Sequence, residues 1–286
     1  MNPGPFIEDI ILKFSRRGME RLRPYLSERY CEDAAKEILS WQRGPVLLAT
    51  GFYVAGHAET DGPAGTVVLA KALQKLGFAP FVLTDENCSH YFEPEGLDTI
   101  YMSYEEGEDF CLSLLADLQP VGLISIERCG RNAEGDYANM HGESIRSHTA
   151  QIDRLFDAAY GKVPTIGVGD GGNEIGMGNL ADVIEQELSL VPCRTKTDRL
   201  VIATVSNWGA YGIAAYLQIL SGVPVFPPVE EVESYLARTV ALGSVDGMSE
   251  ENVCRVDGFS LAESEEVYAA LQRAVTSCTA PSGIRE

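Results

Sequence analysis

Apolar runs and amphipathic stretches alternate along most of the chain. Short runs of consecutive apolar residues, typical of strands buried on both faces, occur at 46–50, 81–84, 99–101, 121–126, 165–168 and 200–205. Apolar residues recur at helical spacing in 7–41, 66–76, 109–118, 149–160, 176–189, 208–221, 229–242 and 261–277. This alternation predicts an α/β fold with a mostly parallel, doubly wound sheet flanked by helices, and with helical additions at both ends.

The same pattern predicts one α/β domain over residues 1–286. Residues 1–44 form N-terminal helices, 45–225 form the core sheet with its loops, and 226–286 form C-terminal helices. With 45% hydrophobic residues the chain has enough apolar surface for a sizeable core. We expect the C-terminal helices either to cover the ligand crevice as a lid or to form a subunit interface in a homo-oligomer.

The charge and the cysteines narrow the classes of partner and compartment. The 42 acidic and 22 basic residues give a formal charge of −20, which repels nucleic acids and anionic membranes. Seven cysteines without a CxxC pair argue against a disulfide framework. The N-terminal residues lack the pattern of a secretory signal, and no run approaches the roughly 18 apolar residues of a membrane span. We therefore expect a cytoplasmic protein.

Two carboxylates stand in the glycine-rich loop that follows the first predicted strand. Glu59 and Asp61 flank Thr60, and Gly62 and Pro63 follow. Carboxylate oxygens suit Mg²⁺, Mn²⁺ or Ca²⁺ rather than zinc. The structural alternative is that Asp61 only caps the helix beginning near Pro63. That alternative gives Glu59 no role, so the pair is a candidate metal site.

A charged pair follows the predicted strand 121–126. Glu127 has the chemistry of a base or a metal ligand, and Arg128 offers a planar set of donors that suits a carboxylate or phosphate. Alternatively, the two side chains belong to a structural ion network. Cys129 next to them has no histidine in an obvious partnering position, so packing is its expected role rather than nucleophilic catalysis.

The polar segment 135–142 contains three side chains that could hydrogen-bond a substrate. They are Tyr137, Asn139 and His141. A lone histidine is more often a surface residue than a metal ligand, so His141 is a weak signal by itself.

The strongest local signal is the loop after the predicted strand 165–168. Asp170, Asn173 and Glu174 bring three oxygen-bearing side chains within five residues, among four glycines in 170–179. The loop lacks the Lys-Ser/Thr of a P-loop and a clean GxGxxG, so no nucleotide cofactor is expected. Metal binding is the simpler interpretation, and a tight turn whose acids cap the next helix is its alternative. Ser206 and Asn207 could add polar contacts after the last strand.

Three segments together resemble the D-glutamate cyclase family. They are Glu59-Thr60-Asp61-Gly62-Pro63, Ser125-Ile126-Glu127-Arg128 with Tyr137-Ala138-Asn139-Met140, and the run Gly169 to Gly178. The likeness extends from about Val46 to Gly222 and is closer to stand-alone microbial members than to the mitochondrial form. It implies a hydro-lyase that converts D-glutamate to 5-oxo-D-proline with the help of a divalent metal. The expected partner is therefore a small acidic amino acid substrate.

Chemistry at the matching positions suggests a role for each residue. Asp170, Glu174 and Asp61, with Glu59, would hold Mn²⁺ or Mg²⁺, or else Ca²⁺, which polarises the γ-carboxylate. Arg128 would grip the α-carboxylate, Glu127 would take the ammonium proton, and Asn173 would orient the substrate. Candidate substrate-binding residues are Thr60, Tyr137, Asn139, His141, Ser206 and Asn207.

Two other functions fit an acid-lined pocket. A metal-dependent phosphatase or phosphate-ester hydrolase would use one or two divalent ions for in-line displacement. A non-enzymatic protein that binds a metal or an amino acid would use the acidic loops only as an ion site.

Overall fold

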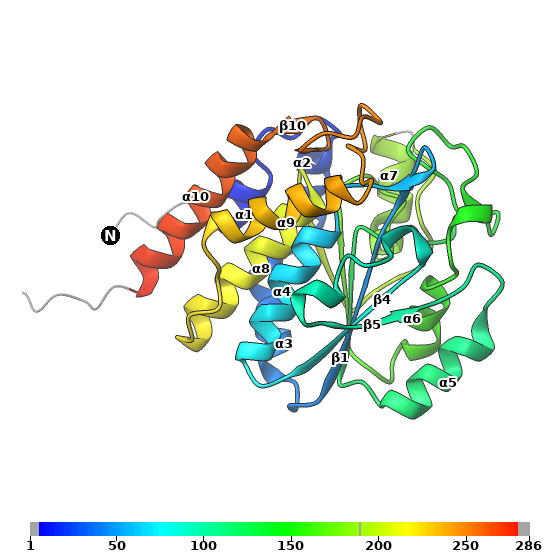
Figure 1. The fold of residues 1–286 in the computed structure, drawn as a ribbon, viewed down its shortest axis with the longest axis horizontal. Helices are drawn as coiled ribbons and strands as arrows, with labels where there is room; N and C mark the ends of the chain where they lie inside the picture. Colours follow the sequence, from blue (N-terminus) through cyan, green and yellow to red (C-terminus); the bar gives the residue numbers. More distant parts are fainter. Residues whose placement is uncertain (1–5, 189, 280–286) are drawn as a thin grey trace, which may run out of the picture.

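Six parallel strands form the central sheet of the computed structural model, which describes residues 6–188 and 190–279. The strand order is β5-β4-β1-β6-β7-β8 (Figure 1). The order reverses between β1 and β6, and in such sheets ligands bind beyond the carboxyl ends of the strands at this point. The strands are β1 (Pro45–Thr50), β4 (Ala79–Thr84), β5 (Asp98–Tyr101), β6 (Gly122–Ile126), β7 (Thr165–Gly169) and β8 (Arg199–Ile202).

Helices cover both faces of this sheet, as the sequence predicted. On one side lie α3 (Tyr30–Ser40), α4 (Pro63–Lys75) and α8 (Ser206–Ser221), and on the other lie α5 (Glu108–Leu118) and α6 (Asp153–Ala159) (Figure 1). Successive residues of β1 alternate between the two cores. Leu48 packs in the first core and Leu47 in the second. Burial on both faces explains why the central strands are continuous apolar runs.

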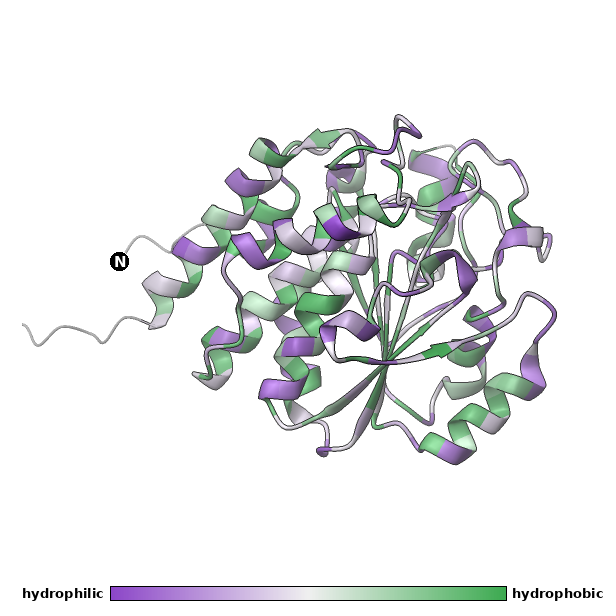
Figure 2. Ribbon diagram, viewed as in Figure 1, coloured by the Kyte–Doolittle hydropathy of each residue, from purple (hydrophilic) through white to green (hydrophobic). Residues whose placement is uncertain are grey.

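Further helices lie at the two ends of the chain and between the strands. Helix α10 packs against α8 and α1, and its sequence alternates hydrophilic and hydrophobic residues (Figure 2). The α-helices not yet named are α1 (Ile7–Ile11), α2 (Met19–Leu22), α7 (Ala181–Glu187), α9 (Val229–Ala241) and α10 (Leu261–Thr279). Short 3₁₀ turns are η1 (Arg23–Tyr25), η2 (Glu86–Cys88), η3 (Glu93–Glu95), η4 (Arg146–His148) and η5 (Met177–Leu180).

The structure differs from the sequence prediction at a few boundaries. The predicted strand 200–205 ends at Ile202, because the amide of Thr204 donates to the carbonyl of Ile11 outside the sheet. Two hairpins were not predicted, β2 (Tyr53–Val54) with β3 (His57–Ala58), and β9 (Arg255–Val256) with β10 (Phe259–Ser260). Each of their strands has two residues, which is too short to give a recognisable alternation.

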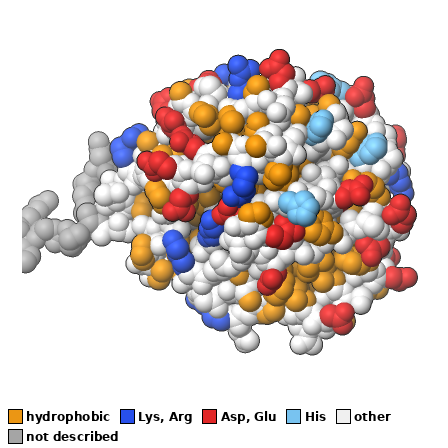
Figure 3. Space-filling model, in the orientation of Figure 1, with side chains coloured by type: hydrophobic (Ala, Val, Ile, Leu, Met, Phe, Trp, Pro, Cys, Tyr) orange, Lys and Arg blue, Asp and Glu red, His pale blue; other side chains and the backbone are white. Residues whose placement is uncertain are grey.

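Acidic side chains are scattered among other types over the face shown in Figure 3 rather than gathered in one patch. Within the described ranges, no helix combines the length and the apolar character needed to cross a membrane.

Candidate active site

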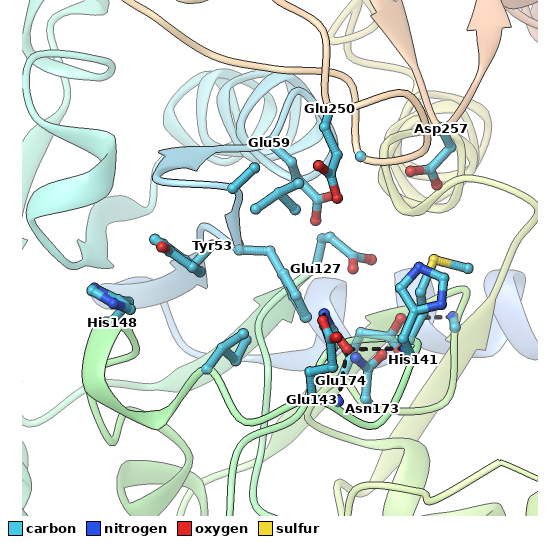
Figure 4. A pocket seen from close by; sticks show the side chains of 18 of the residues that line it. Tyr53, Glu59, Glu127, His141, Glu143, His148, Asn173, Glu174, Glu250 and Asp257 are labelled. Carbon is cyan, nitrogen blue, oxygen red and sulfur yellow. Dashed lines mark hydrogen bonds between the residues drawn. The ribbon is translucent and has the colours of Figure 1, made fainter.

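A cavity of about 370 Å³ opens beyond the carboxyl ends of the strands, where the sequence predicted the site. Phe52 follows β1, Glu127 follows β6 and Gly171 follows β7, and all three line it. Arg17 from the N-terminal segment completes the wall together with Asp257 from the β9–β10 hairpin. Asp257 is labelled in Figure 4. Six acidic residues line the cavity, namely Glu59, Glu127, Glu143, Glu174, Glu250 and Asp257.

Three buried carboxylates form the centre of the site. One oxygen of each of Asp61, Glu127 and Asp170 lies within 4.8 Å of the others. Burial, followed by the charge of Asp257, raises the pKa of Asp61 to about 7. Burial also raises the pKa of Glu127 and of Asp170 well above the usual range, and neighbouring acids add to the effect. Such a cluster retains protons at neutral pH unless a cation compensates its charge.

The N-terminus of α8 holds two of these acids. The amide of Ser206 donates to Asp61 Oδ2 at 2.8 Å and to Asp170 Oδ2 at 2.9 Å, and the amide of Asn207 donates to Asp61 Oδ1 at 2.8 Å. Unpaired amides and the helix dipole favour negative charge at this position. Asp61 therefore caps α8, and not α4 as the structural alternative supposed.

Glu127 occupies a strained position directly after β6. Its φ of 46° lies in the left-handed region, which is uncommon for a residue with a side chain and costs energy. The hydroxyl of Ser206 donates to Glu127 Oε2 at 2.6 Å. Backbone strain of this kind is concentrated at functional sites, and Glu127 is the member of the triad that lines the cavity.

Glu59 directly follows β3 and faces the cavity, and its backbone lies against the segment after α9. It is buried, and its Oε1 has no hydrogen-bond partner. Burial, followed by the charges of Asp257 and Asp61, raises the pKa of Glu59 well above its usual range. A Cβ at Gly247 would collide with Glu59 Oε2 and press on Asp257 Oδ1, so a larger residue would require these carboxylates to move.

Glu174 is fully engaged by its own loop. Its Oε1 accepts from the amide of Gly171 at 2.6 Å, and its Oε2 accepts from the amide of Gly172 at 2.7 Å. These bonds fix the glycine-rich turn, so the tight-turn alternative describes Glu174 well. Asp170, in contrast, caps α8 and not the helix that follows the loop.

Arg17 is the guanidinium that faces the cavity. It pairs with Asp170 Oδ2 at 2.6 Å and also with Asp257. The charges of these two acids outweigh burial and raise the pKa of Arg17, so it stays charged. Arg17 thus joins the N-terminal segment, the end of β7 and the C-terminal hairpin at one point.

Arg128 points away from the cavity and is buried in an ion pair with Asp85 at 2.6 Å. Its other donors reach the carbonyls of Gly51 and Ala150, both at 2.8 Å. Arg128 is therefore not among the cavity-lining residues. It belongs to a structural ion network, which was the alternative role considered for it from the sequence.

Some of the remaining predicted site residues line the cavity, and others do not. Asn139, His141 and Asn173 line it, and His141 and Asn173 are labelled in Figure 4. The side-chain amide of Asn173 donates to the carbonyl of Ala138 at 2.8 Å. Tyr137 is buried and donates to Asp153 at 2.5 Å, away from the cavity.

Three predicted substrate-binding residues lie outside the cavity lining and make hydrogen bonds that hold the surrounding segments, namely Thr60, Ser206 and Asn207. The Thr60 hydroxyl donates to the carbonyl of Arg255 at 2.6 Å, which anchors the strand β9. Asn207 Oδ1 accepts from the amide of Gly65 at 2.6 Å. Cys129 is buried as well, and burial raises the pKa of its thiol well above the usual range, which favours packing over nucleophilic chemistry.

The donor set fits a hard divalent cation. Asp61, Glu127 and Asp170 supply clustered carboxylate oxygens, and Asp170 Oδ1 is buried without any hydrogen-bond partner. Oxygen donors without nitrogen or sulfur suit Mg²⁺, Mn²⁺ or Ca²⁺. This group shares Asp61 and Asp170 with the set predicted from the sequence, includes Glu127, and leaves out Glu59 and Glu174.

Sequence reasoning missed Arg17, Glu250 and Asp257. A signal existed for the last of these, because Asp-Gly between two apolar residues is typical of a two-residue hairpin turn. Asp257 and Gly258 adopt φ of 53° and 75° in that turn. Arg17 had no comparable signal, since its partners come from distant segments of the chain.

Comparisons with known proteins agree on one family. A family model described as "D-glutamate cyclase-like, C-terminal" matches residues 7–272. The mitochondrial D-glutamate cyclase of Homo sapiens is 34% identical over 202 residues, in an alignment that covers 61% of this chain. The matched part is 33% of the human protein, so the chain spans about a third of the length of this curated relative.

Proposed function

The chain belongs to the D-glutamate cyclase-like C-terminal family, and from this premise we propose that it cyclises D-glutamate to 5-oxo-D-proline with release of water. The observation that carries the proposal is the buried triad Asp61, Glu127 and Asp170 beside the cavity. Perturbed carboxyl groups in a cavity are typical of acid–base catalysis.

Proton transfer is the central demand of the reaction. The substrate nitrogen attacks the γ-carboxylate carbon, and both protons of the released water come from the substrate's ammonium group. Glu127, which lines the cavity, takes the first proton from the nitrogen. A protonated neighbour such as Glu59 returns a proton to the departing oxygen, so the cluster relays protons without a net change. Burial raises the pKa values of both groups, which makes each a stronger proton acceptor in its ionised form than an exposed carboxylate.

The charges of the cavity orient the substrate. Acidic side chains attract the ammonium group, and Arg17 offers donors to the α-carboxylate in the role that the sequence assigned to Arg128. Asn139, His141 and Asn173 lie where they can hydrogen-bond the remaining polar atoms. Holding nitrogen and γ-carbon together makes ring closure the favoured path.

Asp61, Glu127 and Asp170 are the residues that would hold a divalent cation. When bound, a Mn²⁺ or Mg²⁺ ion polarises the γ-carboxylate and offsets the negative charge that develops on its oxygens. Arg17 already compensates part of the charge of Asp170, which leaves Asp170 Oδ1 for the cation.

The test is an assay of both enantiomers of glutamate with Mn²⁺ or with EDTA. The amount of 5-oxoproline is measured by chiral chromatography. The Glu134→Gln variant, which changes an exposed acid outside the cavity, is assayed beside the wild type as a control. We expect product from D-glutamate only and its loss with EDTA. No product from either enantiomer, from a folded protein supplied with metal, would overturn the proposal and direct attention to phosphate esters.

A further inference from the structure

We propose that the same site also cyclises γ-D-glutamyl amides and releases an amine in place of water. This inference rests on the proposed function and extends its substrate class. The carboxylate end of the cavity would carry out the ring closure, and an apolar side of the cavity would receive the substituent on the departing amine.

The cavity has two chemically different sides. Phe52, Tyr53, Val54 and Ile145 line it together with the acidic residues. Tyr53 and His148 lie to one side of the labelled carboxylates in Figure 4. The volume of about 370 Å³ falls in the range of sites that enclose drug-sized ligands. Glutamate, with two carboxylates, has no apolar substituent that could contact the apolar side of this cavity.

The apolar side is firmly built and directly joined to the acidic one. The rings of Tyr53 and His148 stack with centroids 4.4 Å apart and an interplanar angle of 10°. The amide of Glu59 donates to the carbonyl of Phe52 at 3.0 Å, so the apolar wall and one of the acids belong to the same hairpin. A group leaving the γ-carbon beside Glu59 would therefore lie against this wall.

Charge also favours an amide. The cavity has six acidic residues and one arginine in its lining, so wherever these acids are ionised and no cation is bound a free γ-carboxylate adds repulsion to the site. A γ-amide is neutral there and is a better electrophile than a carboxylate anion. The ammonium group that is attracted to the acids is the same in both substrates.

The reaction of the amide balances without a co-reactant. The α-nitrogen forms a bond to the γ-carbon, and the bond between that carbon and the amide nitrogen breaks. Two protons leave the α-ammonium group and both end on the departing nitrogen, which is released as an ammonium ion. Glu127 and Glu59 relay these protons as they do in the proposed reaction of D-glutamate.

The experiment compares D-glutamate, D-glutamine and γ-D-glutamyl-benzylamide with the metal-supplemented protein. Both 5-oxo-D-proline and the released amine are quantified. We expect kcat/KM for the benzylamide to exceed that for D-glutamine by about tenfold or more, because its ring is buried against the apolar side.

Variants test the location of this effect. Tyr53→Ala should remove most of the preference for the benzylamide and leave turnover of D-glutamate within about twofold. Val54→Trp, which fills the same side, should block the benzylamide selectively and serves if the first variant does not fold. Tyr160→Ala, at a tyrosine that is 58% exposed and outside the cavity, is the matched control and should change neither reaction.

The outcomes separate this inference from the proposed function. Turnover of D-glutamate without turnover of the amides, or a preference that survives both Tyr53→Ala and Val54→Trp, overturns the inference alone. Turnover of the amides without that of D-glutamate supports the inference and overturns the proposed function. Absence of all three reactions overturns both.

Discussion

Asp61 and Asn207 cap each other's helices. Asp61 Oδ1 accepts from the amide of Asn207 in the first turn of α8, at 2.8 Å. Asn207 Oδ1 accepts from the amides of Gly62 and Gly65 at the start of α4, at 3.1 and 2.6 Å. These hydrogen bonds join the N-termini of α4 and α8. The position of Asp61, a member of the carboxylate triad, therefore depends on a residue far along the chain.

The Asn207→Ala variant tests this exchange. It leaves the buried amides of Gly62 and Gly65 without their acceptor, so we expect the free energy of unfolding to fall by roughly 1–3 kcal/mol. Urea denaturation followed by circular dichroism measures the change. Gln186→Ala, at an exposed amide on α7, is the control. Equal stability of the Asn207 variant and the wild type would contradict the capping role.

Replacing Glu127 by glutamine separates proton transfer from metal binding. The amide oxygen can still contact a cation but cannot take a proton, so we expect turnover of D-glutamate to fall by about 10²- to 10⁴-fold. Mn²⁺ affinity, measured by titration calorimetry, should change much less. A loss of metal binding as large as the loss of turnover would instead show that Glu127 acts mainly as a ligand and not as the base.

Stability of the metal-free protein should depend on pH through Asp61. Its pKa is about 7 in the folded protein, chiefly because of burial, whereas an unfolded aspartate titrates near about 4. The folded state thus binds this proton more tightly, and the resulting stability is full below about pH 4 and is lost as pH rises through about 7.

We therefore expect the free energy of unfolding, measured by urea denaturation in EDTA, to fall between about pH 5 and about pH 8. The raised pKa values of Glu59, Glu127 and Asp170 act in the same direction. Asp61→Asn should show a weaker dependence. A curve for this variant that is parallel to that of the wild type would be inconsistent with the assignment.

Gly247 should be sensitive to the smallest substitution. The Cβ of Gly247→Ala would displace Glu59 or Asp257, both of which line the cavity, so we expect kcat/KM for D-glutamate to fall by about tenfold or more. In Gly107→Ala the added Cβ meets no atom within 4 Å, so this variant is the matched control. Equal activity of the two variants would show that the close packing at Gly247 has no catalytic importance.

The sequence predicted the sheet well because its central strands β1, β6 and β7 are buried on both faces. Runs such as Val46 to Thr50 have no polar positions to obscure them, and the helices between them keep a regular spacing. The position of the site also followed from topology, since Asp61, Glu127 and Asp170 all come after strands that end at the same edge.

Side-chain partners could not be predicted in the same way. Arg128 follows a strand as Glu127 does, yet Asp85 from a neighbouring loop draws it away from the cavity. Tyr137 is likewise turned inward by Asp153. Arg17, which faces the cavity, meets its acids only after segments distant in sequence have packed. Local patterns carry no information on such pairings.

The triple junction at Arg17 makes the cavity depend on a segment that follows the completed sheet. The sheet is complete once residue 202 has joined it, but the cavity also requires Arg17 to meet Asp257 in the β9–β10 hairpin. A chain truncated between these two points would retain all six strands of the sheet but would lack the Asp257 side of the cavity and the core residues of α10.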